Sequence, residues 1–192
     1  MNKIIVIGSG GHARSCIDVI ERENKFEIAG IVNNNNENRT SYPIIGNDND
    51  LENLRSKYSN ALIGIGFTND IRPRLKILEI LTKLQFNTPS IVSPFSYVSK
   101  MAIVKKGTII MHGVVINANV IIGQNCIINS CALIEHDSVI GDNCHVSTRA
   151  NINGEVTIGQ NTFVGSNVTI RNGISINQNQ FLKMGLSVKE NI

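Results

Sequence analysis

The stretch IIGQNCIINSCALIEHDSVIGDNCHVSTRANINGEVTI, residues 121–158, has Ile or Val at every sixth position. The same rule holds for every sixth residue from Val92 to Ile176. Four positions further into each hexad the residues are mostly small or β-branched, as at Ala132, Ser138 and Cys144. A six-residue period with one constant aliphatic position indicates short parallel strands joined by corners, which is a hexapeptide-repeat β-helix.

The residues directly after the aliphatic position favour the same fold. Gly and Asn recur there, at Gly123, Gly141, Gly159, Gly165, Asn117, Asn129 and Asn153. Both types tolerate backbone conformations that other residues avoid, so we expect them to form the corners. A β-sandwich would instead show turn signals at variable spacings of about 8–12 residues. With three hexads per triangular coil, residues eighteen apart stack at roughly 4.8 Å, which predicts about five coils.

The first ninety residues have a different pattern, in which short β-branched runs alternate with helical periods. This predicts a small Rossmann-like βαβαβα domain over residues 1–90, followed by the β-helix over residues 91–192. The fold class is therefore α/β followed by β. The expected strands are Lys3–Gly8, Phe26–Val32 and Ala61–Phe67, and the expected helices are Gly11–Glu23, Asp50–Tyr58 and Asn69–Leu84.

Composition and charge narrow the classes of function. The net charge of +3 arises from 18 basic and 15 acidic residues without a basic run, so nucleic acid is not an expected partner. The first residues, MNKIIVIGSGGH, have too few consecutive apolar residues for a signal peptide. No 18-residue apolar stretch of the kind that spans a membrane follows. We therefore expect a cytoplasmic protein without a membrane segment. The four cysteines form no CxxC pair, which predicts reduced thiols.

His136 is the first candidate for chemistry. It lies two positions after Ile134, at an outward place in its hexad, and Glu135 and Asp137 flank it. Gly154 is eighteen residues further on and has no side chain to cover the imidazole. A base beside an exposed backbone amide is the minimal equipment for acyl transfer. The simpler interpretation is a solvated corner histidine, and the charged flanks together with the glycine favour the functional one.

A zinc site is a second possibility for the histidines. In β-helices of the γ-carbonic anhydrase type, three histidines bind zinc at a subunit interface, and the candidates here are His112, His136 and His145. The nine-residue gap between the last two predicts that they lie on different faces of the coil. We therefore expect no metal.

The loop GSGGHA, Gly8–Ala13, follows an expected strand and opens an expected helix. It matches G-x-G-x-x-A, so backbone amides at the helix start can accept phosphate. A dinucleotide site also requires an acid after the second strand, where this chain has VNNNN at residues 32–36. NAD is therefore not favoured, whereas a uridine or sugar-phosphate ligand stays open. The structural alternative is a tight turn that requires glycine, although such a turn does not require His12.

Taken together, VIGSGGHA, ALIGIGF followed by IR, and LIEHDSVIGDNCHVS resemble the NeuD/PglD-type bacterial sugar acetyltransferases over almost the whole chain. The resemblance implies a left-handed β-helix homotrimer that uses acetyl-CoA to acetylate an amino sugar carried on UDP, for surface-glycan or glycoprotein-sugar biosynthesis. In close relatives the acceptor is a hydroxyl of sialic acid. By resemblance, the catalytic residues are His136, Asp137 and Gly154; the residues near acetyl-CoA are His145, Gly154 and Gly165; and the substrate-binding residues are Gly8, Gly10, Gly11, His12, Asn33, Asn34 and Asn129.

Two departures from the family pattern affect these expectations. The family has Asp-Asp after the second strand, whereas this chain has the uncharged Asn33 and Asn34, so the reaction type is better supported than the substrate. The family also has a V-G-x-P-A-like tail that encloses the acetyl donor, whereas FLKMGLSVKENI lacks it. A non-catalytic trimeric scaffold or binding protein therefore stays open as an alternative.

The expected mechanism follows from amine chemistry. An amine must be neutral to attack a thioester, so His136 removes a proton as the nitrogen adds to the acetyl carbon. Asp137 orients the imidazole, and the Gly154 amide stabilises the oxyanion, an effect worth roughly 3–4 kcal/mol per donor in well-studied enzymes. Neither a metal nor a covalent enzyme intermediate is required.

Overall fold

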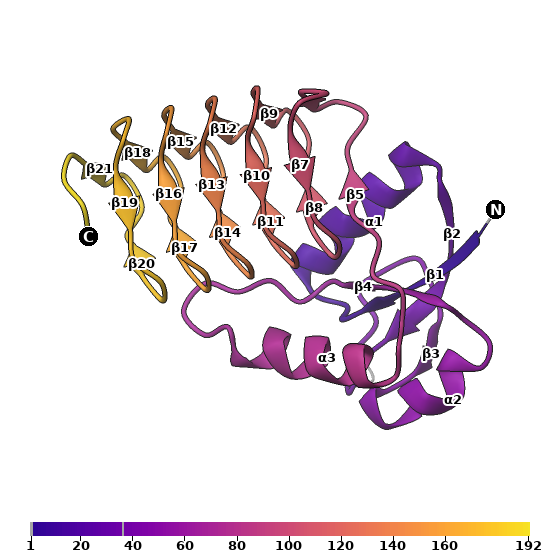
Figure 1. Cartoon of the computed structure of the whole chain (residues 1–192). Helices are drawn as coiled ribbons and strands as arrows, with labels where there is room; N and C mark the ends of the chain where they lie inside the picture. The colour runs from indigo at the N-terminus through magenta and orange to yellow at the C-terminus, as the bar shows by residue number, and fades with distance from the viewer. Residues whose placement is uncertain (1, 36) are drawn as a thin grey trace. The chain divides into compact units, whose positions relative to one another are not determined.

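The hexads fold into a parallel β-helix with three faces, in which successive coils stack along one axis (Figure 1). The computed structural model describes residues 2–35 and 37–192. The chain divides into two units, one ending at Pro89 and the other comprising Ser90–Ile192. The β-helix is thus a unit of its own.

Every strand of the β-helix is two residues long. The second residue points inward, and Ile134, Ile140 and Val146 are all buried in one core. The strands are β5 (Ile91–Val92), β6 (Tyr97–Val98), β7 (Ile103–Val104), β8 (Ile109–Ile110), β9 (Val115–Ile116), β10 (Ile121–Ile122), β11 (Ile127–Ile128), β12 (Leu133–Ile134), β13 (Val139–Ile140), β14 (His145–Val146), β15 (Asn151–Ile152), β16 (Thr157–Ile158), β17 (Phe163–Val164), β18 (Thr169–Ile170), β19 (Ser175–Ile176), β20 (Phe181–Leu182) and β21 (Ser187–Val188).

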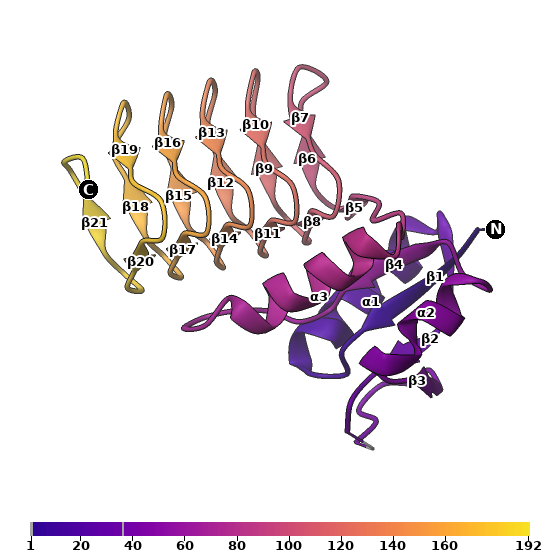
Figure 2. The same cartoon turned by 60° about the horizontal axis from the view of Figure 1, so that its bottom comes forward.

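Strands eighteen residues apart pair in register and form three parallel sheets. One sheet has five strands in the order β19-β16-β13-β10-β7, and the other two have six, β20-β17-β14-β11-β8-β5 and β21-β18-β15-β12-β9-β6. Figure 2 shows the last of these rows along the length of the unit. The prediction of a hexad β-helix is confirmed, and the aliphatic position continues beyond Ile176 to Leu182 and Val188.

The corners differ from the expectation. The left-handed backbone conformation occurs three positions after the aliphatic residue, for example at Asn119, Cys131 and Asp137, whose φ angles are 60°, 59° and 60°. Glycine is required directly after the aliphatic residue for a different reason. A Cβ on Gly141 would lie 2.6 Å from the amide nitrogen of Gln160 in the next coil. These glycines are therefore explained by close stacking of coils, not by positive φ.

Polar residues inside the β-helix hydrogen-bond to the corners of neighbouring coils. The Ser138 hydroxyl donates to the carbonyl of Asn153 at 2.9 Å and accepts from the amide of Val156 at 3.2 Å. The Cys126 thiol donates to the carbonyl of Gly141 at 3.1 Å. Small residues with a short donor satisfy buried backbone groups here, which explains why Ser, Thr and Cys share this position. All four cysteines are free thiols.

The N-terminal unit has a parallel sheet of order β3-β2-β1-β4. Its elements are β1 (Asn2–Ile7), α1 (Gly11–Glu23), β2 (Phe26–Val32), β3 (Ile44–Gly46), η1 (Asp48–Asp50), α2 (Leu51–Arg55), β4 (Asn60–Ile63) and α3 (Arg72–Lys83). The α/β prediction is confirmed, with differences. Strand β3 was not expected, because three residues are too few to show a period. Helix α2 is shorter, and residues 48–50 form the 3-10 helix η1, which a capping box between Asn47 and Asp50 begins.

Strand β4 also ends at Ile63 rather than at Phe67, so residues 64–67 form a loop at the carboxyl end of the sheet. Arg74 of α3 is buried and donates from Nη1 to the carbonyls of Ile63 and Ile65. This guanidinium fixes the start of the loop. Within the described residues, none of the helices combines the length and the apolar composition of a membrane span.

We expect Gly141→Ala to lower the free energy of unfolding of the β-helix by about 3 kcal/mol, because the new Cβ would overlap backbone that cannot rotate away. Gly173→Ala is the matched control. Its φ of +71° disfavours a side chain, but nothing lies within 4 Å of its Cβ position, so only the backbone cost of about 1 kcal/mol applies. Urea unfolding of both variants measures the difference. Equal losses would show that coil stacking does not select the glycine.

Candidate functional site

His136 and Asp137 form a hydrogen-bonded pair at the corner that follows β12. The distance between His136 Nδ1 and Asp137 Oδ2 is 2.8 Å. Asn119, in the stacked position one coil earlier, donates from Nδ2 to the other carboxylate oxygen at 2.9 Å. Asp137 itself occupies the left-handed corner position with φ of 60°, which Asp tolerates better than most residues. Both carboxylate oxygens are thus engaged, and the imidazole is held by its Nδ1 edge.

Gly154 lies directly against the His136 ring. A Cβ at Gly154 would be 2.7 Å from Cε1 and 2.8 Å from Nε2 of the imidazole. The missing side chain therefore makes room for the ring, as the eighteen-residue spacing predicted. The His136 and Asp137 side chains are 58% and 47% exposed, so a ligand can reach them.

The hydrogen bond between His136 and Asp137 shifts the pKa values of both side chains. The hydrogen bond to Asp137 is the largest cause of a raised His136 pKa, and nearby carboxylates add to it. The pKa of Asp137 is lowered, mainly by the hydrogen bond from Asn119 and then by His136. An ionised carboxylate only accepts hydrogen bonds, so the Nδ1–H donates and the neutral imidazole keeps its lone pair on Nε2. His136 can therefore accept a proton on Nε2 and act as a base.

His145 lies on a different face from His136, on β14. It precedes the core residue Val146 on this strand, yet it is only 6% exposed. The reason is the stacked coil, since the Phe163 ring lies edge-on at 5.1 Å from the imidazole. Asn129 contacts this histidine, with 3.3 Å between its Nδ2 and His145 Nε2. The structure therefore groups Asn129 with His145 rather than with His136.

Gly165 is also explained by coil stacking. A Cβ there would lie 2.6 Å from the amide nitrogen of Met184 and 2.7 Å from the carbonyl oxygen of Leu182. Its expected contact with acetyl-CoA stays a prediction.

The three histidines considered for zinc belong to different parts of the β-helix. His112 Nδ1 lies 2.6 Å from the Ser93 hydroxyl, His136 pairs with Asp137, and His145 packs against Phe163. Within residues 2–35 and 37–192, no three or more His, Cys, Asp or Glu side chains gather in a group suited to hold a metal ion.

A second candidate site is a pocket of about 450 Å³ at the carboxyl end of the N-terminal sheet. Gly8 has a φ of +105°, which requires glycine. Gly10 caps α1, and nothing lies within 4 Å of its Cβ position, so the helix start opens into the pocket. Such a helix start favours an anion. The lining residues are Gly8, Ser9, Gly10, Gly11, His12, Asn33, Asn35, Glu37, Arg39, Gly64, Ile65 and Gly66.

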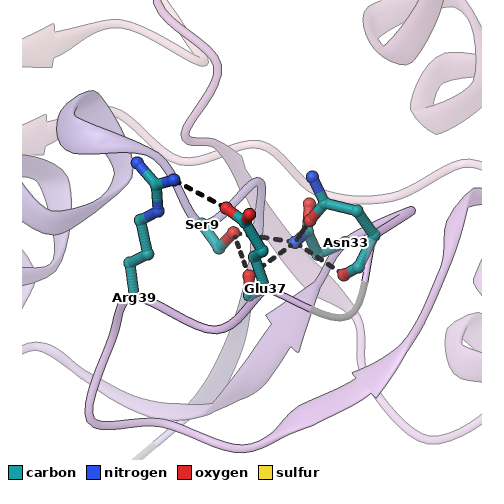
Figure 3. Close-up of polar contacts among 5 residues, drawn as sticks. Ser9, Asn33, Glu37 and Arg39 are labelled. Carbon is teal, nitrogen blue, oxygen red and sulfur yellow. Dashed lines mark hydrogen bonds and ion pairs between the residues drawn. The ribbon is translucent and has the colours of Figure 1, made fainter.

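Asn33 is the centre of a polar network in this pocket (Figure 3). Its Nδ2 donates to the Ser9 hydroxyl at 2.7 Å and to the carbonyl of Glu37 at 3.1 Å. Asn34 does not line the pocket. It exchanges two hydrogen bonds with Asp48, one to the carboxylate at 2.7 Å and one from the amide at 3.0 Å. Of Asn33 and Asn34, both expected to bind substrate, only Asn33 lies in the pocket wall.

Several site residues were not found from the sequence. Asn119 was detectable, because it lies eighteen residues before Asp137 and residues with this spacing stack. Glu37 and Arg39 had no such signal, because they follow a polar run without a period. They form an ion pair at the pocket, with 2.6 Å between Arg39 Nη2 and Glu37 Oε2.

A hexad β-helix with a histidine–carboxylate pair over a glycine, following a small α/β unit, defines the class of hexapeptide-repeat acyltransferases. Residues 3–81 match the family model of the PglD N-terminal domain. Residues 101–136 and 137–172 match that of the bacterial transferase hexapeptide (six repeats), and residues 155–190 match the hexapeptide repeat of succinyl-transferase. The chain belongs to the NeuD/PglD-type sugar acetyltransferase family and is an acyltransferase.

Solved structures agree with this assignment. A variant of perosamine N-acetyltransferase from Caulobacter crescentus, in complex with CoA and GDP-perosamine, matches with a TM-score of 0.92 and 28% identity over 100% of this chain and 90% of that chain. The acetyltransferase domain of PglB from Neisseria gonorrhoeae, in complex with acetyl coenzyme A, shares the fold with a TM-score of 0.90 and 24% identity, over 100% and 93% of the two chains. The three parallel sheets of this chain are consistent with a left-handed β-helix. No curated protein sequence matches the chain significantly.

Asp137→Asn is expected to lower the pKa of His136, because the variant removes the negative charge that stabilises the imidazolium. Titration of the His136 ring protons by NMR measures the change. Glu155→Gln is the control, since Glu155 contributes to the raised pKa only as the smallest cause, and its effect should be smaller. An unchanged His136 pKa in Asp137→Asn would contradict the hydrogen-bonded pair.

Proposed function

We propose that this protein transfers the acetyl group of acetyl-CoA to the amino group of a nucleotide-linked sugar. The observation that carries the proposal is the His136–Asp137 pair lying against Gly154. The relative from Caulobacter crescentus supports the reaction type, since it is named as an N-acetyltransferase in complex with CoA and GDP-perosamine.

His136 acts as the general base. Its Nε2 takes the proton from the acceptor nitrogen as that nitrogen adds to the thioester carbon, while Asp137 and Asn119 hold the ring from the Nδ1 side. The Gly154 amide stabilises the oxyanion, and the CoA thiolate then leaves. Because the His136 pKa is raised, the neutral base becomes fully available only above the usual imidazole range. Activity should therefore increase with pH through the His136 pKa.

The N-terminal pocket binds the nucleotide that carries the acceptor sugar. Its glycine turn and the start of α1 suit a diphosphate, and the polar wall around Asn33 suits a nucleoside. A UDP-linked 4-amino sugar for glycan biosynthesis is our first candidate acceptor. A GDP-linked amino sugar is the second, because the Caulobacter crescentus relative is in complex with GDP-perosamine. Free sialic acid is less favoured, since it lacks a nucleotide for this pocket to hold.

We expect His136→Ala to lower kcat for acetyl transfer by about 10²–10⁴-fold with little change in acceptor KM, because only the proton transfer is lost. Thiol release from acetyl-CoA in the presence of UDP- and GDP-linked amino sugars measures it. Gly154→Val should also lower kcat, since its side chain would displace the His136 ring. Full activity in His136→Ala would show that His136 is only a solvated corner residue. No transfer by the wild type would favour the scaffold alternative.

A homotrimer belongs to the same proposal, because His136 and Asp137 are half exposed on one subunit and a small acceptor there needs a second wall. Light scattering should give about three times the chain mass of 21.0 kDa. A monomer with full activity would refute a site completed by a neighbouring subunit.

A further inference from the structure

In the N-terminal unit, asparagines rather than an acid come directly after β2. In βαβ nucleotide sites, a carboxylate after the second strand commonly accepts hydrogen bonds from the ribose hydroxyls. Asn33 follows β2 in this chain, and its amide is already bonded to Ser9 and to backbone carbonyls. Asn34 is bonded to Asp48 and lies outside the pocket lining. Asn33 offers a ribose hydroxyl only its neutral amide oxygen, so a charged acceptor has to come from another residue.

Glu37 brings a carboxylate to this pocket from further along the chain (Figure 3). Its backbone carbonyl accepts hydrogen bonds from the Ser9 hydroxyl at 2.9 Å and from Asn33 Nδ2 at 3.1 Å. Ser9 belongs to the glycine turn Gly8–Gly11 that suits phosphate. The backbone of Glu37 is thereby tied to the phosphate end of the pocket, while its side chain is 65% exposed and accessible to a ligand.

Arg39 resolves the electrostatic conflict of a carboxylate beside a diphosphate. An isolated negative charge at this position would repel the ligand's phosphates. The Arg39 guanidinium lies 2.6 Å from the Glu37 carboxylate and also lines the pocket. The pair is close to neutral as a unit, so Glu37 keeps free acceptor positions without a net repulsive charge.

We propose that Glu37 binds the ribose hydroxyls of the nucleotide and that Arg39 neutralises it there. This inference rests on the proposed function. Ribose is favoured over the base because Glu37 is hydrogen-bonded to the phosphate-binding turn, and ribose is the part of a nucleotide joined directly to phosphate. A carboxylate also offers two acceptor oxygens for the two adjacent hydroxyls.

The test compares UDP and GDP with their 2′,3′-dideoxy analogues by calorimetry on the full-length protein. For the diphosphates that it binds, the wild type should prefer the ribose form by about tenfold, the size expected for hydrogen bonds to a charged group. Glu37→Gln should remove most of the preference for the ribose form, because the unpaired Arg39 charge affects both diphosphates alike while only the ribose form loses its contact with the carboxylate. Glu27→Gln, an exposed acid on β2 outside the pocket lining, is the matched control and should keep the preference.

Arg39 is tested in the same assay. Arg39→Gln should weaken both forms, because Glu37 then repels the diphosphate, and adding Glu37→Gln should restore affinity for the dideoxy form. An unchanged ribose preference in Glu37→Gln, an equal loss for both forms, or a wild type without preference would overturn the inference while leaving the proposed function intact. A wild type that binds neither UDP nor GDP would instead overturn the nucleotide-sugar assignment itself.

Discussion

The stacking of residues eighteen positions apart is the constraint on which the β-helix and its candidate site depend. Ladder hydrogen bonds between two-residue strands hold each coil in register with the next, as where the Leu133 amide donates to the carbonyl of Ala150 at 2.9 Å. The same register places Asn119 beside Asp137 and Gly154 beneath His136. A rigid repeat therefore fixes distances between side chains that are far apart in sequence, and the site needs no loop to assemble it.

The stacking of coils also determines which residue types each position of the hexad accepts. Inward places accept only aliphatic residues or short donors that satisfy neighbouring backbone, as Ser138 does. Outward places are free to carry function, although an aromatic residue one coil further can cover them, as Phe163 covers His145. His136 stays open because its stacked neighbour is glycine. Its altered pKa consequently comes from a charged partner and not from burial.

The pocket of the N-terminal unit is formed by loops rather than by stacked repeats. The strands end at one edge of the sheet, and the loops that follow them meet there. Ser9, Asn33 and the backbone of Glu37 are hydrogen-bonded to one another, so segments from two loops form one wall. Arg74 holds a third segment through the carbonyls of Ile63 and Ile65. The result is a preformed polar surface next to a helix start.

The β-helix could be predicted from the sequence alone, because a strict period of six leaves a single regular way to bury the aliphatic residues. The contact of Gly154 with His136 was equally predictable, since it follows from the period. Four features became visible only in the folded chain: which corner residue has positive φ, the burial of His145, the bonds between Asn34 and Asp48, and the position of Glu37 and Arg39 at the pocket. These features depend on packing and on non-periodic loops, in which contacts between distant residues, and not local spacing, select the conformation.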